Sequence, residues 1–189
     1  MKRNTTTSLI TIISGFYLLE LLRPSLQENL FLINKALFSD GAVHGVGAGE
    51  WYRVLTVALV HGGIFHLGFN MYALLVLGNP LEAAFGRTRF LIIFFISLVA
   101  GSLASLYLNP INQPSVGASG ALFGLFGAFA VAGRKIGADV RSILVIIGIN
   151  FAFSFLVPNV DWHAHLGGLL GGALTATVMV KIPRRGRQG

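Results

Sequence analysis

The sequence predicts an all-α membrane protein with six transmembrane helices. Three observations support this fold class: 54% of the 189 residues are hydrophobic and only 11% are charged, the mean hydropathy is +0.73, and apolar runs recur along the whole chain. A soluble domain of this length carries about 25% charged residues. Because so much apolar surface cannot be buried in one small core, we expect the lipid bilayer to be the solvent.

Six apolar segments define the expected helices of a single domain, 1–189, and several are marginal for the roughly 20 residues that cross a bilayer. The first follows Lys2 and Arg3 like a secretory signal, but "ELLRPSLQENL" after it lacks a small-residue cleavage site, so we expect it to be retained. The long loop 24–52 is too hydrophobic for free solution and too broken to span, which places it at the external membrane interface. The six segments lie near 5–22, 54–78, 88–108, 116–133, 141–157 and 163–181.

The basic residues predict the orientation. If the N-terminus is cytoplasmic, only Arg23, Lys35 and Arg53 of the 14 lysines and arginines lie outside. The positive-inside rule favours this arrangement, with both termini in the cytoplasm. The net charge of +7 does not indicate a nucleic-acid partner, because the basic residues lie between apolar runs and at the termini. Cysteine is absent, which excludes disulfides and thiolate metal sites.

Polar side chains gather near the external ends of the second, fourth and sixth expected helices. They belong to "HGGIFHLGFN", "GASG" and "WHAHLGG", and the topology brings His66, Asn70, Ser119 and His165 to a similar depth. Polar groups inside a bilayer are costly and therefore indicate function. His66 and Asn70 are four residues apart and share a helix face. His163 and His165 point in nearly opposite directions, about 200° apart, so only one can face the bundle.

Glycines predict a close contact between the fourth and sixth helices, because small residues allow backbones to approach. Such a contact would bring Ser119 within hydrogen-bond reach of His165, and neutral imidazole is the usual base that activates a serine. His66 and Asn70 would stabilise the oxyanion, together with the N-terminus of the fourth helix. Since Asp161 lies in a loop, we expect a Ser–His dyad without an acid. The glycines are Gly117, Gly120, Gly124 and Gly127 on one helix and Gly167, Gly168, Gly171 and Gly172 on the other.

These motifs, in this order, resemble those of the rhomboid intramembrane serine proteases of the minimal six-helix type, across nearly the whole chain. "GASG" resembles the family's nucleophile motif and implies Ser119, and "AHLGG" implies His165 as the catalytic histidine. "HGGIFHLGFN" resembles the family's His-x4-His-x3-Asn pattern. This pattern implies His66 and Asn70 in the oxyanion hole and a structural role for His61.

The resemblance also implies supporting residues. "EWYRVLT" resembles the Trp-Arg motif of the first loop through Trp51 and Arg53, which we expect to anchor the loop and lipid. Phe123 stands where the family stacks an aromatic ring, often tyrosine, on the catalytic histidine. Gly117 and Gly120 flank the serine and permit close approach of backbone and substrate.

The activity that the resemblance implies is hydrolysis of a peptide bond within or next to a substrate's transmembrane helix, after a small residue. No cofactor and no metal are needed. Substrate would enter laterally from lipid near the second and fifth helices, and water would reach Ser119 from outside. The expected location is the cell inner (plasma) membrane.

Two other function classes stay open at this point. One is a catalytically silent rhomboid relative that binds membrane proteins; such relatives typically lack the serine or the histidine, and this chain keeps both. The other is a transporter or metal carrier using the membrane histidines, but no ligand pair shares one helix face and no intramembrane carboxylate accompanies them.

Glu20, near the end of the first helix, is expected to pair with Arg23. The role of His163 is left open.

Overall fold

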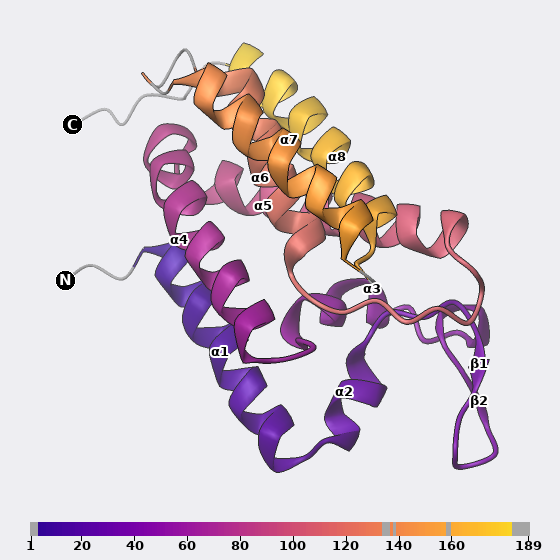
Figure 1. Ribbon diagram of the computed structural model, residues 1–189. Helices are drawn as coiled ribbons and strands as arrows, with labels where there is room; N and C mark the ends of the chain where they lie inside the picture. Colours follow the sequence, from indigo (N-terminus) through magenta and orange to yellow (C-terminus); the bar gives the residue numbers. More distant parts are fainter. Residues whose placement is uncertain (1–3, 134–136, 138, 158–159, 183–189) are drawn as a thin grey trace.

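The described residues of the computed structural model are 4–133, 137, 139–157 and 160–182, and they contain eight α-helices and one short antiparallel hairpin (Figure 1). Long helices form the body of the molecule, and the hairpin extends away from them (Figure 1). The elements are α1 Thr5–Leu22, α2 Ser25–Leu30, β1 Ala36–Leu37, β2 Val43–His44, α3 Arg53–Thr56, α4 Ile64–Phe85, α5 Arg87–Leu108, α6 Ser119–Ala132, α7 Val140–Leu156 and α8 Trp162–Lys181, with single 3-10 turns at Val46–Ala48 and Val57–Leu59.

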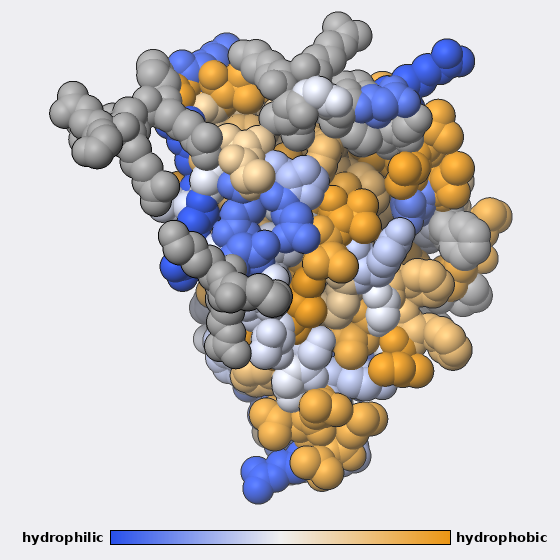
Figure 2. Space-filling model, turned by 90° about the vertical axis from the view of Figure 1, so that its left-hand side faces the viewer, coloured by the Kyte–Doolittle hydropathy of each residue, from blue (hydrophilic) through white to orange (hydrophobic). Residues whose placement is uncertain are grey.

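Among the described residues, three helices are long and apolar enough to cross a membrane: α1, α4 and α5. α6 and the apolar part of α7 are shorter than a full span. Large hydrophobic side chains are exposed on these helices, and Figure 2 shows one such face, with hydrophilic residues gathered mainly in its upper half. Exposed apolar surface on this scale is characteristic of a protein surrounded by lipid.

The expected helix at 54–78 is wrong at both ends. The chain makes a short helix, α3, and one 3-10 turn, and α4 begins only at Ile64, because Gly63 at its start has a φ of 147° that no helix accommodates. At the other end α4 continues to Phe85 through Pro80. Proline costs a helix one backbone hydrogen bond, but neighbouring structure compensates for it inside membrane proteins.

The core is a three-helix packing of α5, α6 and α8 through glycines. A Cβ added to Gly168 or Gly172 would collide with the carbonyl of Gly120 or Gly124, so α6 and α8 touch backbone to backbone. Gly167 and Gly171 face α5 instead, against Ala100. The predicted glycine face of α8 is therefore two faces, each of which takes one neighbouring helix.

Gly117 does not belong to the glycine face that the sequence suggested for α6. α6 begins at Ser119, and Gly117 lies in the preceding turn with a φ of 107°. Only glycine adopts this conformation without strain.

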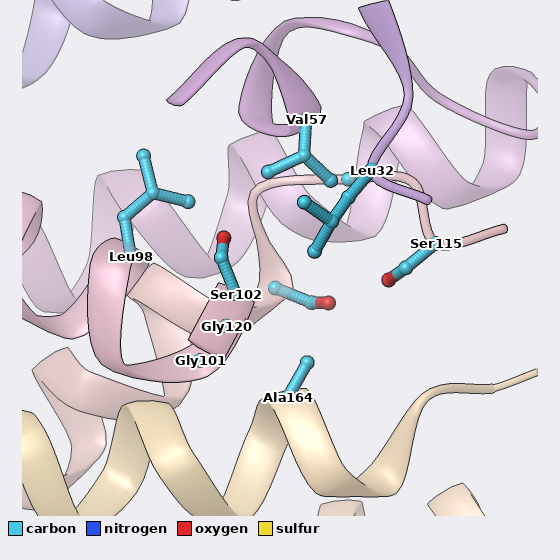
Figure 3. Close-up of a pocket in the computed structure, with 10 residues that line it drawn as sticks. Leu32, Val57, Leu98, Gly101, Ser102, Ser115, Gly120 and Ala164 are labelled. Carbon is cyan, nitrogen blue, oxygen red and sulfur yellow. The ribbon is translucent and has the colours of Figure 1, made fainter. Parts of the chain in front are cut away.

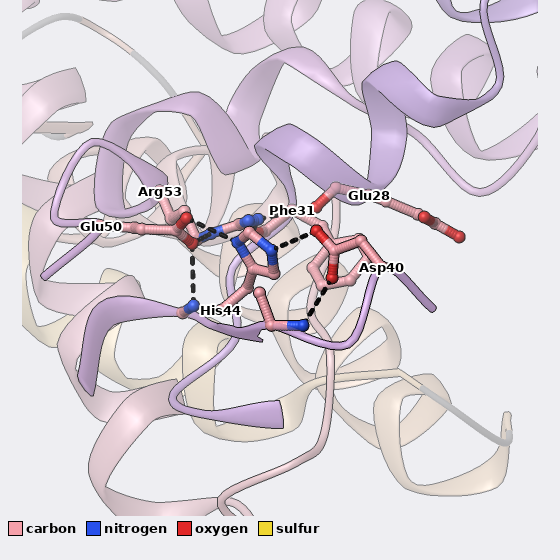
Figure 4. Close-up of polar contacts among 8 residues, drawn as sticks. Glu28, Phe31, Asp40, His44, Glu50 and Arg53 are labelled. Atoms are coloured by element: carbon pink, nitrogen blue, oxygen red, sulfur yellow. Dashed lines mark hydrogen bonds and ion pairs between the residues drawn. The ribbon is translucent and has the colours of Figure 1, made fainter. Parts of the chain in front are cut away.

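The first loop is held by a buried arginine (Figure 4). Arg53 is 1% exposed. Its Nε donates to Glu50 at 2.6 Å and its guanidinium donates to the carbonyls of Glu28 and Phe31 at 2.8 and 2.9 Å. The expected contact of Arg53 with lipid is therefore wrong, whereas its role in anchoring the loop fits these bonds. Trp51 is 59% exposed and remains available to an interface.

His44 extends this network toward the hairpin. Its ring bridges Glu50 at 2.8 Å and Asp40 at 2.9 Å. These hydrogen bonds, first to Glu50 and then to Asp40, raise the pKa of His44 above 6.5. Burial alone would raise the pKa of Glu50, but the bonds from His44 and Arg53 lower it to about 2.

α1 is attached to α4 at the end opposite the loop. Glu82 accepts hydrogen bonds from the backbone N–H groups of Thr5 and Thr6 and from the Thr6 hydroxyl, at 2.7–2.8 Å. The basic residues Lys2, Arg3, Arg134, Lys135, Arg184, Arg185 and Arg187, on which much of the predicted orientation rests, lie outside the described residues.

Candidate active site

Ser119 and His165 lie in contact, as the sequence predicted. The Oγ of Ser119 is 2.9 Å from the Nε2 of His165, although 46 residues separate them along the chain. Ser119 is the first residue of α6 and His165 is in the first turn of α8. The glycine contacts between α6 and α8 bring the two residues together, because no side chain holds the helices apart. A hydroxyl and an imidazole at this distance can exchange a proton.

Phe123 fixes the plane of the imidazole. Its ring stacks on His165 with centroids 4.1 Å apart and an angle of 9° between the planes. One helical turn separates Phe123 from Ser119, so α6 supplies both the hydroxyl and the stacking ring. His165 is 6% exposed, while Ser119 is half-buried and therefore reachable.

Backbone hydrogen bonds anchor the turn before Ser119. Leu32 and Ser115 form an isolated bridge with N···O distances of 3.0 and 2.8 Å, and the N–H of Gly117 donates to the Val57 carbonyl at 2.9 Å. α6 has no side-chain N-cap. The first N–H groups of a helix lack intrahelical partners, so this end provides donors and a partial positive charge at Ser119.

His66 lies beside this turn, and Asn70 lies one turn further along α4. A Cβ on Gly117 would be 2.7 Å from the Cε1 of His66, so only glycine fits there. Asn70 is 5% exposed, and its amide donates to the His66 carbonyl at 2.8 Å. Its Oδ1 has no hydrogen-bond partner among the described residues. Of the two predicted oxyanion residues, His66 thus lies beside the turn before the serine, and Asn70 is hydrogen-bonded to the backbone of His66.

A small cavity of about 10 Å³ adjoins Ser119 (Figure 3). Glycines make up part of its wall, so it admits nothing larger than about one water molecule. The Ser102 hydroxyl in its lining donates to the Val54 carbonyl at 2.9 Å. Its lining also includes Leu32, Val57, Leu98, Gly101, Ser115, Gly117, Gly120 and Ala164.

Comparison with known proteins gives the family. The model of the rhomboid domain matches residues 48–182. The chain belongs to the rhomboid family. The Rhomboid protease GluP of Bacillus subtilis (strain 168) is 42% identical over 149 residues, covering 76% of this chain and 29% of the relative. YdcA of the same strain is 36% identical over 146 residues, covering 75% and 73% of the two chains. RHOMBOID-like protein 6, mitochondrial, of Arabidopsis thaliana is 37% identical over 179 residues, covering 85% of this chain and 56% of the relative.

This rhomboid is therefore a helical, multi-pass membrane protein. It spans well under two thirds of the length of GluP and of RHOMBOID-like protein 6.

Sequence reasoning missed Ser154 in the rhomboid site. The Oγ of this α7 residue lies 2.7 Å from the Nδ1 of His165, the ring nitrogen that faces away from Ser119. Ser154 is 4% exposed. The available signal was a lone hydroxyl in the apolar run "INFAFSFL", which is the same kind of signal that singled out Ser119.

Glu20 was assigned the wrong partner. Its carboxylate accepts from the side chain of Gln27 at 2.6 Å and from the backbone N–H of His61 at 3.2 Å, and not from Arg23. The His61 ring packs edge-on against His66 with centroids 5.1 Å apart, and neither of its nitrogens has a partner among the described residues. α1 thus holds the backbone of His61, whose ring abuts His66.

His163 and Asp161 hold the start of α8. His163 Nδ1 is 2.5 Å from the Asn109 Oδ1 of α5, and its ring lies against Trp162. Asp161 Oδ1 caps α8 by accepting from the Ala164 N–H at 3.0 Å. Burial alone would raise the pKa of Asp161, but hydrogen bonds from Ser105 and Ala164 hold it below its usual range. Its charge favours the positive end of α8.

Proposed function

We propose that this rhomboid is an intramembrane serine endopeptidase that cleaves transmembrane segments of membrane proteins by a Ser119–His165 dyad. The observation that carries the proposal is the 2.9 Å contact between Ser119 Oγ and His165 Nε2 at the start of α6. The relatives named as rhomboid proteases support the same reaction class. No cofactor or metal has a role in it.

The geometry supports an acyl-transfer mechanism. Ser119 Oγ attacks the scissile carbonyl carbon while its proton passes to Nε2 of His165. The imidazolium then gives that proton to the leaving amine as the C–N bond breaks. Water, deprotonated by the same nitrogen, hydrolyses the ester and restores the Ser119 hydroxyl.

The negative charge on the tetrahedral intermediate needs donors close to Ser119. The free N–H groups at the start of α6 supply backbone donors. We assign the side-chain donors to His66, which lies next to the Gly117 turn, and to Asn70, one helical turn further along α4. Such donors stabilise charge more strongly in a water-excluded site than in water.

The substrate would be a membrane protein entering laterally from the bilayer, between α4 and α7. Both helices pack on α6 and leave large apolar side chains uncovered, including Phe65, Phe69 and Leu156. The small cavity beside Ser119 favours a small residue before the cleaved bond. We place the protein in the cell inner (plasma) membrane as six spans, with both termini cytoplasmic and the site opening outward.

A non-cleaving binding protein and a histidine-based metal carrier are the two rival classes. Ser119 in contact with His165 argues against the first. For the second, no group of three or more His, Cys, Asp or Glu side chains that could hold a metal ion occurs within the described part of the chain.

The test is labelling of the detergent-solubilised protein with a fluorophosphonate, an electrophile that reacts with an activated serine. Wild type is compared with Ser119→Ala and His165→Ala. We expect labelling of wild type and loss of labelling in both variants. A folded wild type that does not label would support the binding protein, and equal labelling of Ser119→Ala would refute the assignment of the nucleophile.

A further inference from the structure

Ser154 makes two contacts that together determine where its proton lies. Its Oγ is 3.0 Å from the Asn150 carbonyl oxygen one turn earlier in α7, and 2.7 Å from Nδ1 of His165. A carbonyl can only accept a hydrogen bond, whereas a hydroxyl has one proton to donate and lone pairs to accept. If the hydroxyl donates to Asn150, it must accept from Nδ1 of His165.

This arrangement fixes the tautomer of His165. With the proton on Nδ1, the other nitrogen, Nε2, is left as an acceptor, and it faces Ser119 Oγ at 2.9 Å. The opposite tautomer would place a proton between Nε2 and Ser119 and remove the base. Both Ser154 and His165 are buried, so water is excluded as a competing partner. Which nitrogen carries the proton is set by the bond that the other ring nitrogen makes.

We propose that Ser154 is a positioning residue that holds His165 in its Nδ1-protonated form, so that Nε2 is ready to take the proton of Ser119. The inference rests on the proposed function. It adds a third member to the serine–histidine pair, and this member is a hydroxyl supplied by α7.

Ser154 lies near the end of α7, and His165 lies in the first turn of α8. Ser154 and His165 are only 11 residues apart in sequence, and α7 and α8 run side by side in Figure 1. Asp161 directly precedes α8, but its Oδ1 accepts from the Ala164 N–H and caps that helix. Phe123 stacks on the face of the ring, so Ser154 and Ser119 take its two nitrogens at the edges.

The first test measures fluorophosphonate labelling at several probe concentrations for wild type, Ser154→Ala and Ser154→Thr. We expect Ser154→Ala to lower the maximal labelling rate about tenfold, with the half-saturating concentration unchanged, because one buried hydrogen bond is lost. Threonine keeps the hydroxyl and its bond to the carbonyl four residues back, so it should restore the rate. A Ser154→Ala protein that labels like wild type, or a Ser154→Thr protein as slow as Ser154→Ala, would overturn the proposal.

Asn150→Ala is the matched control. It lies one turn away in the same helix, and its exposed amide donates to the Ile146 carbonyl at 2.9 Å. The substitution leaves the Asn150 main-chain carbonyl in place, so labelling should match wild type. A loss equal to that of Ser154→Ala would show that any polar change in α7 has this effect, which would refute the specific role of Ser154.

The second test reads the tautomer directly by 15N NMR of ring-labelled histidine. The chain has five histidines, and the signal of His165 is assigned by its loss in His165→Gln. We expect protonation at Nδ1 in wild type and a mixture of tautomers in Ser154→Ala. Protonation of wild type at Nε2 would exclude the proposal. The NMR measurement does not depend on activity, so it tests the inference separately from the proposed function. Failure of the proposed function would instead appear as a wild type that does not react with the fluorophosphonate.

Discussion

Asn70 is a buried polar residue whose side-chain amide is only partly hydrogen-bonded within the described residues. One N–H of its amide donates to the His66 carbonyl, and its Oδ1 has no partner within the described residues. A primary amide has two N–H donors, so the second is free to serve another acceptor. An unpaired buried polar group destabilises the folded state, and such groups often occur at functional sites.

We therefore predict that Asn70→Ala lowers the rate of fluorophosphonate labelling about 100-fold, the effect of removing one oxyanion donor. The measurement is the labelling rate of purified protein. Asn79→Ala is the control on the same helix, because Asn79 accepts from the Asn4 side chain at an exposed site. If the two variants label alike, Asn70 is not an oxyanion donor.

The contact between α6 and α8 determines the site at the scale of elements. A Cβ at Gly168 would collide with the Gly120 carbonyl, and Gly120 follows Ser119 directly. Close packing of this kind cannot yield by side-chain rotation, so one added methyl group must move a helix.

We predict that Gly168→Ala destabilises the protein by about 1–3 kcal/mol, the usual cost of overpacking. Because the helices separate, labelling of Ser119 should fall at least tenfold. Thermal unfolding in detergent and fluorophosphonate labelling measure the two effects. Gly15→Ala is the control, since a Cβ at Gly15 meets nothing within 4 Å; it should keep full labelling and gain about 0.5–1 kcal/mol from alanine's helix propensity. Unchanged stability in Gly168→Ala would contradict this packing.

The hydrogen bonds from His44 to Glu50 and Asp40 in the first loop depend on pH. The pKa of His44 is raised, so its contribution to stability is complete below pH 6.5 and is lost as the pH rises through the raised value. The pKa of Glu50 is lowered to about 2, so its contribution is complete above its ordinary value of 4.5. The His44–Glu50 interaction therefore contributes most to stability between pH 4.5 and pH 6.5.

We expect the difference in Tm between wild type and His44→Gln to be largest near pH 5.5 and to shrink toward pH 9. Subtracting the variant removes the titration of all other groups. A difference in Tm that is the same at both pH values would show that His44 is not held as a cation.

The helices α1, α5, α7 and α8 could be predicted within a residue or so because long apolar runs in a bilayer leave the backbone no alternative to helix. The segment 54–63 could not, because a loop that packs on α5 is as apolar as a helix in lipid. The Ser119–His165 contact followed from depth and glycine spacing. Ser154 was missed because its partner is Nδ1 of a histidine across a turn, a contact that helical periodicity does not encode. The buried site of Arg53 was missed for the same reason: its partners are distant backbone carbonyls.

At the scale of the whole molecule, orientation decides which side of the membrane supplies water to the site. The proposed topology places the N-terminus in the cytoplasm and the hairpin outside. Arg53, one of the three basic residues assigned outside, is neutralised by Glu50 and buried, which weakens its conflict with the positive-inside rule.

Single cysteines test this topology cleanly, because the chain contains none. We predict that a membrane-impermeant thiol reagent labels Val43→Cys in intact cells and labels Asn4→Cys only after lysis. Both positions are exposed. Labelling of Asn4→Cys in intact cells and of Val43→Cys only after lysis would show that the protein has the opposite orientation. Labelling of both positions in intact cells would show that α1 does not cross the membrane, which would refute the proposed topology.

The separation of Ser119 and His165 along the chain has a consequence in time. The two residues are 46 positions apart, with all of α7 between them. At ribosomal rates of about 5–20 residues per second, the serine is made roughly 2 to 9 seconds before the histidine. In the proposed dyad, Ser119 would lack its base during that interval. If the dyad acts as proposed, a newly made molecule cannot cleave neighbouring helices, or its own, until α8 has packed against α6.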